Sequence, residues 1–209
     1  MTPDELLTTT RAVRKRLDLT RPVPREVLLE CVEIALQAPT GSNRQGWHFV
    51  FVSDPATKTA MADLYRQGYD PYASMPRPEY PEGDPRGERQ SFVGESSRYL
   101  RDHFHEVPWM LVPVHRGRVD GQPAPMQAGF WGSLLPAVWS FMLAGRGRGL
   151  GTAWTTLHLP FEREAAELLG IPYDDYTQGG LMPVAYYTGS SFSPAARLPA
   201  ESVVHWESW

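Results

Sequence analysis

The chain has little cysteine and no excess of positive charge. Cys31 is its only cysteine in 209 residues, so the chain can form neither an internal disulfide nor a cysteine-rich zinc site. Its 20 Lys and Arg residues are outnumbered by 24 Asp and Glu residues, which gives a formal net charge of −4. Such a chain lacks the broad basic field that holds a nucleic-acid backbone. We therefore expect no nucleic-acid partner, and we expect Cys31 to be a buried core residue.

The N-terminus lacks the apolar run of a secretory signal peptide, because charged residues are spread through residues 1–17. This favours a cytoplasmic protein. Residues 121–145 carry no charge over a length that could span a bilayer. The Gln, Ser and Pro residues within them argue against a membrane span, so no membrane partner is expected. The Trp, Leu and Phe residues of the stretch instead predict a helix that is apolar on all sides, in the core or in a subunit interface.

Hydrophobic periodicity and helix caps predict helices and strands mixed around one sheet in a single domain, residues 1–209. The clearest cap is a capping box at Thr2 and Glu5, with Pro3 at the first helical position. Helices are predicted at residues 2–17, 24–38, 54–65, 88–105, 121–145 and 160–169. Strands are predicted at residues 48–52, 107–114 and 181–189. Residues 190–209 are expected to be a C-terminal extension that ends in a candidate edge strand.

The segment from residue 68 to residue 89 contains five prolines and charges of both signs. It is too long for an ordinary connection between two elements. We expect a lid or excursion rather than a continuous helix, and such a lid is a candidate for selecting the substrate. Its composition does not identify that substrate.

Four cations lie within six residues near the N-terminus, at Arg11, Arg14, Lys15 and Arg16. Such a run is typical of a solvated helix face. It also suits an anion site, because the planar fork of arginine donates two hydrogen bonds to a phosphate. His103 and His105 are two residues apart, so on a helix their rings point to different faces, and the other four histidines have no Cys or acidic partner at metal-ligand spacing. No metal site is therefore predicted.

Residues 38–52, APTGSNRQGWHFVFV, join a run of turn-forming residues to an apolar strand. The simplest interpretation is a connection between a helix and a strand. The alternative is a ligand cradle, in which the polar residues contact a bound molecule and the strand holds them in place. The loop residues alone leave both interpretations open.

Together with three other segments, this loop resembles the nitroreductase family of FMN-dependent flavoproteins. The four segments, in the family's order, read TTTRAVRKRLDLTRPVPREVL, APTGSNRQGWHFVFV, GLGTAWTT and PAARLP. The resemblance implies an α+β fold with a central mixed or antiparallel sheet, flanking helices and a long central helix at a dimer interface. It also implies a homodimer that binds FMN with residues of both subunits.

The resemblance assigns the cofactor contacts residue by residue. Arg11 and Ala12 fall in the phosphate-contacting pattern, where Ala12 replaces the family's serine. Arg14 falls beside the pyrimidine edge of the flavin, and Arg197 becomes the second cation for the phosphate. Ser133, in the central helix, takes the place of a flavin-contacting amide.

Two further segments complete the site that the resemblance implies. The loop at residues 38–46, which we name the opening loop, would line the flavin bound mainly by the other subunit, through Pro39, Thr40, Gly41 and Asn43. In the same loop, Gly46 stands where the family usually has proline. The segment that faces flavin N5 and O4 contains Trp154, Thr155, Thr156 and Leu157.

The activity that the resemblance implies is carried by the flavin, so no catalytic side chain is assigned. NADH or NADPH would give a hydride to flavin N5, leave, and be replaced by a small aromatic or quinone-like acceptor in a ping-pong cycle. Three alternatives stay open. The Thr155 and Thr156 pair also resembles the family's reductive dehalogenase branch. A biosynthetic dehydrogenase of the same family and a non-catalytic flavin-binding protein are the other two.

Overall fold

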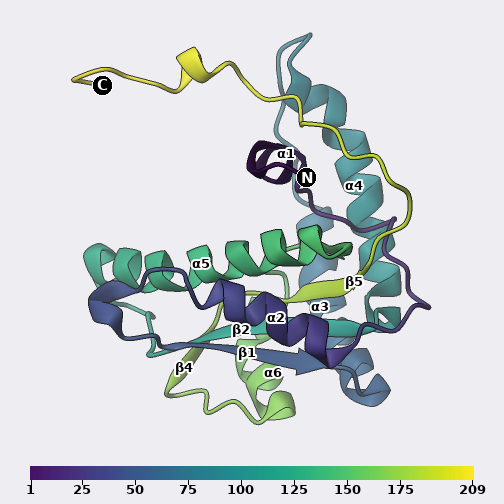
Figure 1. Cartoon of the computed structure of the whole chain (residues 1–209), viewed down its shortest axis with the longest axis vertical. Helices are drawn as coiled ribbons and strands as arrows, with labels where there is room; N and C mark the ends of the chain where they lie inside the picture. The colour runs from purple at the N-terminus through teal and green to yellow at the C-terminus, as the bar shows by residue number, and fades with distance from the viewer.

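A five-stranded antiparallel sheet forms the centre of the computed structural model, which describes residues 1–209 (Figure 1). The strands follow the order β1-β2-β5-β3, and β4 pairs with β2 beside this path. Their bounds are β1 Trp47–Val52, β2 Trp109–Arg116, β3 Leu150–Thr152, β4 Tyr176–Gln178 and β5 Met182–Tyr186. The predicted α+β class is therefore confirmed, with an antiparallel sheet.

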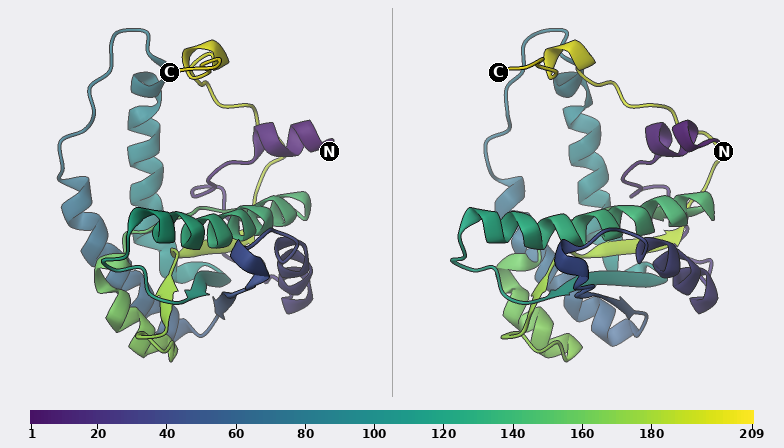
Figure 2. Two further views of the ribbon diagram at one scale, coloured as in Figure 1. Left: turned by 90° about the vertical axis from the view of Figure 1, so that its left-hand side faces the viewer. Right: turned by 60° about the vertical axis from the view of Figure 1, so that its left-hand side comes forward.

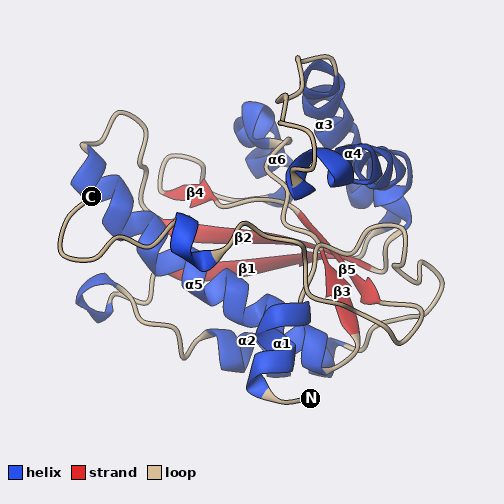
Figure 3. Cartoon of the chain, turned by 90° about the horizontal axis from the view of Figure 1, so that it is seen from above, coloured by secondary structure: helices blue, strands red, loops and turns tan.

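Helices cover both faces of the sheet (Figure 3). One face packs against α2 (Arg25–Ala35) and α5 (Ala124–Gly147), and the other packs against α3 (Pro55–Ala73) and α6 (Glu162–Leu169). Side chains of β2 alternate between the two cores, because successive residues of a strand point to opposite faces. Val112 lies in the core under α3, whereas Leu111 lies in the core under α5. Cys31 is fully buried on α2, as predicted.

The long central helix is confirmed as α5, 24 residues in length. Its inner side is buried against the sheet, with Leu134, Val138 and Phe141 at 0% exposure. Its outer side leaves Met126 at 61% and Trp139 at 40% exposure. By length and hydropathy α5 would also qualify as a membrane span, a test that the core helices of soluble proteins pass as well. In a single chain, α5 is therefore half-covered.

The first helix is much shorter than predicted. Instead of residues 2–17, α1 covers only Pro3–Thr9, and the chain turns extended at Thr10 with φ −66° and ψ 129°. The reason is a long-range pairing: the N–H of Val13 donates to the carbonyl of Thr152 at 2.8 Å, beside β3. A run of three β-branched threonines also weakens the helix at this point. The four cations at residues 11–16 thus lie on a non-helical segment that ends in a turn, and not on a helix face.

The predicted excursion at residues 68–89 is also shorter than expected. Helix α3 continues to Ala73 with Pro71 in its last turn, and α4 (Pro85–His103) begins before the excursion was expected to end. The core explains the longer α3, because Tyr65 and Tyr69 are buried one helical turn apart. Only residues 74–84 are non-helical, and Figure 2 shows them at the far end of α4, which projects from the sheet layers.

The expected edge strand in residues 190–209 is wrong. This extension runs out from the body (Figure 1), and its only regular element is a 3-10 turn at Ala200–Ser202. The strand was expected in residues 201–209, which are all exposed, so no contact with the core or the sheet holds them extended. The short strand β4 was not predicted. It pairs with the end of β2, from Val114 to Arg116.

Candidate functional site

A cavity of about 310 Å³ lies beside the non-helical N-terminal segment, residues 11–16. We name it the arginine cavity, because its lining carries many cations and no acidic residue. The lining residues are Arg11, Ala12, Val13, Arg14, Lys15, Arg16, Arg89, Ser96, Ser191, Phe192 and Ser193. Three of the predicted contacts, Arg11, Ala12 and Arg14, are thereby brought together.

Arg11 stands among other cations without a carboxylate partner. Its Nη2 donates to the carbonyl of Ser193 at 2.7 Å. Burial lowers the pKa of Arg11, and the nearby Arg197 and Arg89 lower it further by repulsion. Arginines held this close repel one another unless an anion lies between them. The arrangement therefore fits a phosphate group, and it places the predicted Arg197 close to Arg11.

Two stacked guanidinium groups fix the chain that carries Ser193 and Arg197. The guanidinium carbon of Arg16 lies 4.2 Å from the ring centre of Phe192, and that of Arg146 lies 3.9 Å from it. Arg16 also donates to the carbonyl of Ser191 at 2.7 Å. These contacts hold the start of the C-terminal extension against the arginine cavity.

The segment 154–157 follows β3 and offers free backbone donors. The indole of Trp154 donates to the carbonyl of Gly179 at 2.9 Å, and the hydroxyl of Thr155 donates to the carbonyl of Leu181 at 2.6 Å. Both side chains are therefore committed to the protein. The N–H groups of Thr156 and Leu157 donate to no acceptor in the chain. They are the donors available to a ligand.

The opening loop forms a separate arrangement on α5. The N–H of Gly41 donates to the hydroxyl of Ser133 at 3.0 Å, and that hydroxyl donates to the carbonyl of Gly129 at 2.8 Å. Ser133 thus pins the loop to the first half of α5. Asn43 adopts a positive φ of 52°, and its side-chain oxygen accepts from Gln45 at 2.9 Å. Such strained backbone is retained where the surrounding structure fixes it, often at binding sites.

The predicted site residues therefore fall into two groups in one chain. The first group, at the arginine cavity and the segment after β3, is Arg11, Ala12, Arg14, Trp154, Thr155, Thr156, Leu157 and Arg197. The second group, on the loop and α5, is Pro39, Thr40, Gly41, Asn43 and Ser133. In Figure 1 the loop lies at the start of α5. The arginine cavity lies toward the other end of α5, because its lining residue Phe192 stacks on Arg146 in the last turn of that helix. A single chain does not bring the loop to the arginine cavity.

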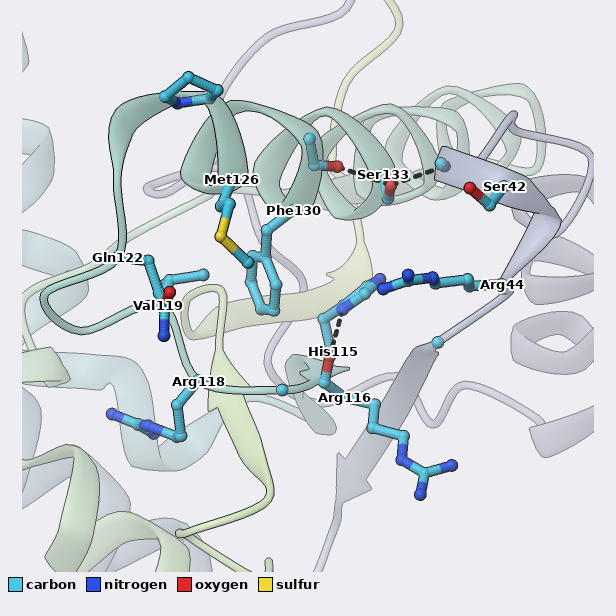
Figure 4. A pocket seen from close by; sticks show the side chains of 15 residues that line it. Ser42, Arg44, His115, Arg116, Arg118, Val119, Gln122, Met126, Phe130 and Ser133 are labelled. Atoms are coloured by element: carbon cyan, nitrogen blue, oxygen red, sulfur yellow. Dashed lines mark hydrogen bonds between the residues drawn. The ribbon is translucent and has the colours of Figure 1, made fainter.

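A larger cavity of about 760 Å³ lies between the loop and the first half of α5 (Figure 4). We name it the loop–helix cavity. Its wall includes His115, which is 7% exposed and whose Nε2 has no hydrogen-bond partner. The other ring nitrogen, Nδ1, lies 2.9 Å from the carbonyl of Arg116. Burial lowers the pKa of His115, so the ring is neutral at neutral pH.

Sequence reasoning missed several residues of both cavities. Arg89 belongs to the arginine cavity, although it was expected in a lid. Arg44 and His115 line the loop–helix cavity and had no assigned role. The available signals were a cation inside the loop and the run HRGR at the end of a predicted strand, residues 115–118. No three His, Cys, Asp or Glu side chains are placed to hold a metal ion.

Comparisons with known proteins agree with this fold. The structure of oxidized iodotyrosine deiodinase bound to FMN and 3-iodo-L-tyrosine has a TM-score of 0.72 and 21% identity, covering 99% of this chain and 98% of that chain. The FMN and NADPH-dependent nitroreductase NfnB from Sphigopyxis sp. strain HMH has a TM-score of 0.70 and 21% identity, covering 100% of both chains. At identities this low the likeness shows a shared fold alone.

Two sequence comparisons add to the structural ones. A stretch of 42 residues is 50% identical to an NADH dehydrogenase of Thermus thermophilus, and it covers 20% of this chain and 20% of that protein. The match thus spans about a fifth of the curated relative. The family model described as "Nitroreductase family" matches residues 7–186, which include all five strands, the whole lining of the loop–helix cavity and the lining of the arginine cavity except residues 191–193. The chain belongs to the nitroreductase family.

Proposed function

We propose that this protein is an FMN-dependent oxidoreductase that takes a hydride from NADH or NADPH and reduces nitroaromatic, quinone or related acceptors. The observation that carries the proposal is the arginine cavity, where Arg89 and Arg197 both repel Arg11 and no acidic residue lines the wall. A phosphate group would relieve that repulsion through charge-assisted hydrogen bonds. FMN carries such a phosphate, and FMN is bound in solved members of this fold.

The residues beside the arginine cavity fit the rest of FMN. Ala12 pairs with Thr152, so the segment 154–157 leaves β3 next to the cations. The free N–H groups of Thr156 and Leu157 suit the polar edge of a flavin ring, which needs donors. Arg14 lies on the same cavity wall and would favour negative charge on the reduced ring. When bound, FMN supplies the hydride chemistry, and these residues orient it.

The separation of the two groups of site residues supports a homodimer. Helix α5 is 24 residues long, or about 36 Å, and the loop is pinned to its first half. The arginine cavity touches its last turn, where Arg146 stacks on Phe192. A two-fold axis across α5 would bring the loop of one copy to the arginine cavity of the other. The half-covered outer side of α5 suits such an interface.

Reduction by pyridine nucleotide is the direct test of the enzyme. The purified protein should be mixed with NADH or NADPH in a stopped-flow instrument, and then with nitro, quinone, enone and haloaromatic acceptors. We expect rapid flavin reduction followed by reoxidation by at least one acceptor class, with ping-pong kinetics. Bound flavin that neither nucleotide reduces would refute the enzyme and leave a flavin-binding protein.

The contribution of Arg197 can be measured without turnover. Charge-assisted hydrogen bonds are worth about 1.5–3 kcal/mol, so Arg197→Ala should weaken FMN binding at least about tenfold. Arg25→Ala is the matched control, because Arg25 begins α2, away from the arginine cavity. Equal FMN affinity in the two variants would remove Arg197 from the site.

Reductive dehalogenation is a second candidate function, and it rests on Thr156. The hydroxyl of Thr155 is committed to Leu181, whereas the hydroxyl of Thr156 is exposed and has no partner in the chain. A hydroxyl donor beside the flavin would favour one-electron steps. Redox titration of the purified protein separates the candidates: one two-electron step supports hydride transfer. Two one-electron steps that merge in Thr156→Ala but not in Thr155→Ala would favour the dehalogenase.

A further inference from the structure

From the side chains that line the loop–helix cavity, we infer that it binds a small aromatic carboxylate with an O–H or N–H donor. Arg44 meets the carboxylate, the Nε2 of His115 accepts from the donor, and Phe130 packs against the ring. The inference rests on the proposed function, because Gly41 and Ser133 line this cavity and are also expected to contact the FMN of the other copy.

The size and charge of the cavity fit a small anion. Its volume of about 760 Å³ lies within the range of small-molecule sites. No Asp or Glu is among its fifteen lining residues. Arg118 is neutralised by Glu162 at 2.9 Å and by Asp120 at 2.6 Å. Arg44 and Arg116 have no carboxylate partner, so the cavity keeps positive charge.

Arg44 points into the cavity, and its orientation indicates which kind of anion fits there. Figure 4 shows its side chain crossing the cavity toward His115, whereas Arg116 and Arg118 point away. One planar guanidinium matches one planar carboxylate through two parallel hydrogen bonds. A doubly charged phosphate would call for more than one inward cation. The cavity therefore suits a carboxylate better.

His115 supplies the second polar contact. Its Nδ1 is occupied by the carbonyl of Arg116, which leaves Nε2 as an acceptor in the neutral ring. That nitrogen is buried and unpaired, although buried polar groups are nearly always hydrogen-bonded. An O–H or N–H of a ligand would satisfy it.

Gly46 keeps the approach to His115 open. A Cβ atom at this position would lie 3.0 Å from Cε1 and 3.3 Å from Nε2 of His115. The lack of a side chain at Gly46 therefore leaves room at the unpaired nitrogen. On the other side, the rings of Phe130 and His115 meet edge to face with centroids 4.5 Å apart. Phe130 and Met126 give the cavity an apolar wall for an aromatic ring.

Calorimetric titration of the purified full-length protein with 4-hydroxybenzoate tests this inference. We expect saturable binding that weakens at least about tenfold in Arg44→Gln, which removes a charge-assisted contact. Gly46→Ala should weaken it severalfold by crowding His115. Arg21→Gln, which removes a cation stacked on Tyr186 outside the cavity, should leave it unchanged. Circular dichroism and flavin absorbance of each variant separate lost binding from lost folding or lost FMN.

Three further ligands sharpen the result. Benzoate lacks the donor, and phenol lacks the carboxylate, so both should bind more weakly than 4-hydroxybenzoate. Phenyl phosphate should bind no better than benzoate. The inference is overturned if 4-hydroxybenzoate shows no saturable binding, or if Arg44→Gln and Gly46→Ala bind it as tightly as the wild-type protein does. It is also overturned if phenyl phosphate binds more tightly than benzoate.

Discussion

Gly68 of α3 packs directly on the backbone that offers donors to the flavin. A Cβ atom at Gly68 would overlap the carbonyl oxygen of Leu157 and lie 2.8 Å from its carbonyl carbon. Carbon atoms in proteins approach to about 3.5–4.0 Å, so Gly68→Ala must move one backbone by about 1 Å. Neither partner is a flexible side-chain end. The substitution therefore displaces the segment 154–157 or the helix.

The expected effect on stability is modest. Alanine favours a helix interior over glycine by about 1 kcal/mol, and overpacking opposes this by about 1–3 kcal/mol. The net loss should be no more than about 2 kcal/mol, so the variant should fold. FMN binding should weaken as well. Losing the hydrogen bonds of two N–H groups at about 1 kcal/mol each corresponds to about thirtyfold weaker FMN.

The assay is FMN titration of the apoprotein together with thermal unfolding. Gly94→Ala in α4 is the matched control, because its new Cβ would meet only the guanidinium of Arg77, at 3.1 Å or more. That flexible end can move aside, so the control should keep wild-type FMN affinity. If Gly68→Ala binds FMN as tightly as Gly94→Ala does, the segment after β3 does not contact the flavin.

Three other substitutions or deletions test separate parts of the molecule. Burial lowers the pKa of His158 to about 4 from 6.5, so its neutral form stabilises the fold above pH 6.5. The free energy of unfolding of the wild-type protein should therefore drop by about 3 kcal/mol as the pH falls to 4. Urea titrations of His158→Gln over the same pH range should show a smaller drop, and a drop equal to that of the wild-type protein would refute the assignment. Phe192→Ala removes the ring between Arg16 and Arg146 and should weaken FMN binding severalfold, whereas unchanged affinity would show that the extension is held by other contacts. Replacing residues 75–83 with a short glycine-serine linker should change acceptor preference but not FMN affinity, and failure to fold would make this segment structural.

Elements with strong local signals were predicted well from the sequence. The strand predicted at residues 48–52 is β1, Trp47–Val52, and the helix predicted to stop at Gly170 does so with φ 67°. The central helix was found from its uncharged length alone. Each of these depends on residues within one or two turns of one another, so the sequence pattern contains the needed information.

The N-terminal segment shows why other elements were missed. A capping box correctly predicted the start of α1, but no local signal predicted that the chain would leave the helix at Thr10. That change depends on pairing between Val13 and Thr152, which lie far apart in sequence. The same holds for the arginine cavity, where Arg11 meets Ser193. The family resemblance predicted the cations, whereas their arrangement required the tertiary structure.

Sedimentation of the full-length protein at decreasing concentrations, followed by both protein and flavin absorbance, tests the shared FMN site most directly. If the loop of one copy completes the arginine cavity of the other, flavin should sediment only with a species of twice the 23.5 kDa chain mass. That species should carry about one FMN per chain, and Arg197→Ala should reduce its flavin without dissociating it. A flavin-loaded monomer at any concentration would contradict the shared site, and a colourless dimer that binds no added FMN would contradict the cofactor.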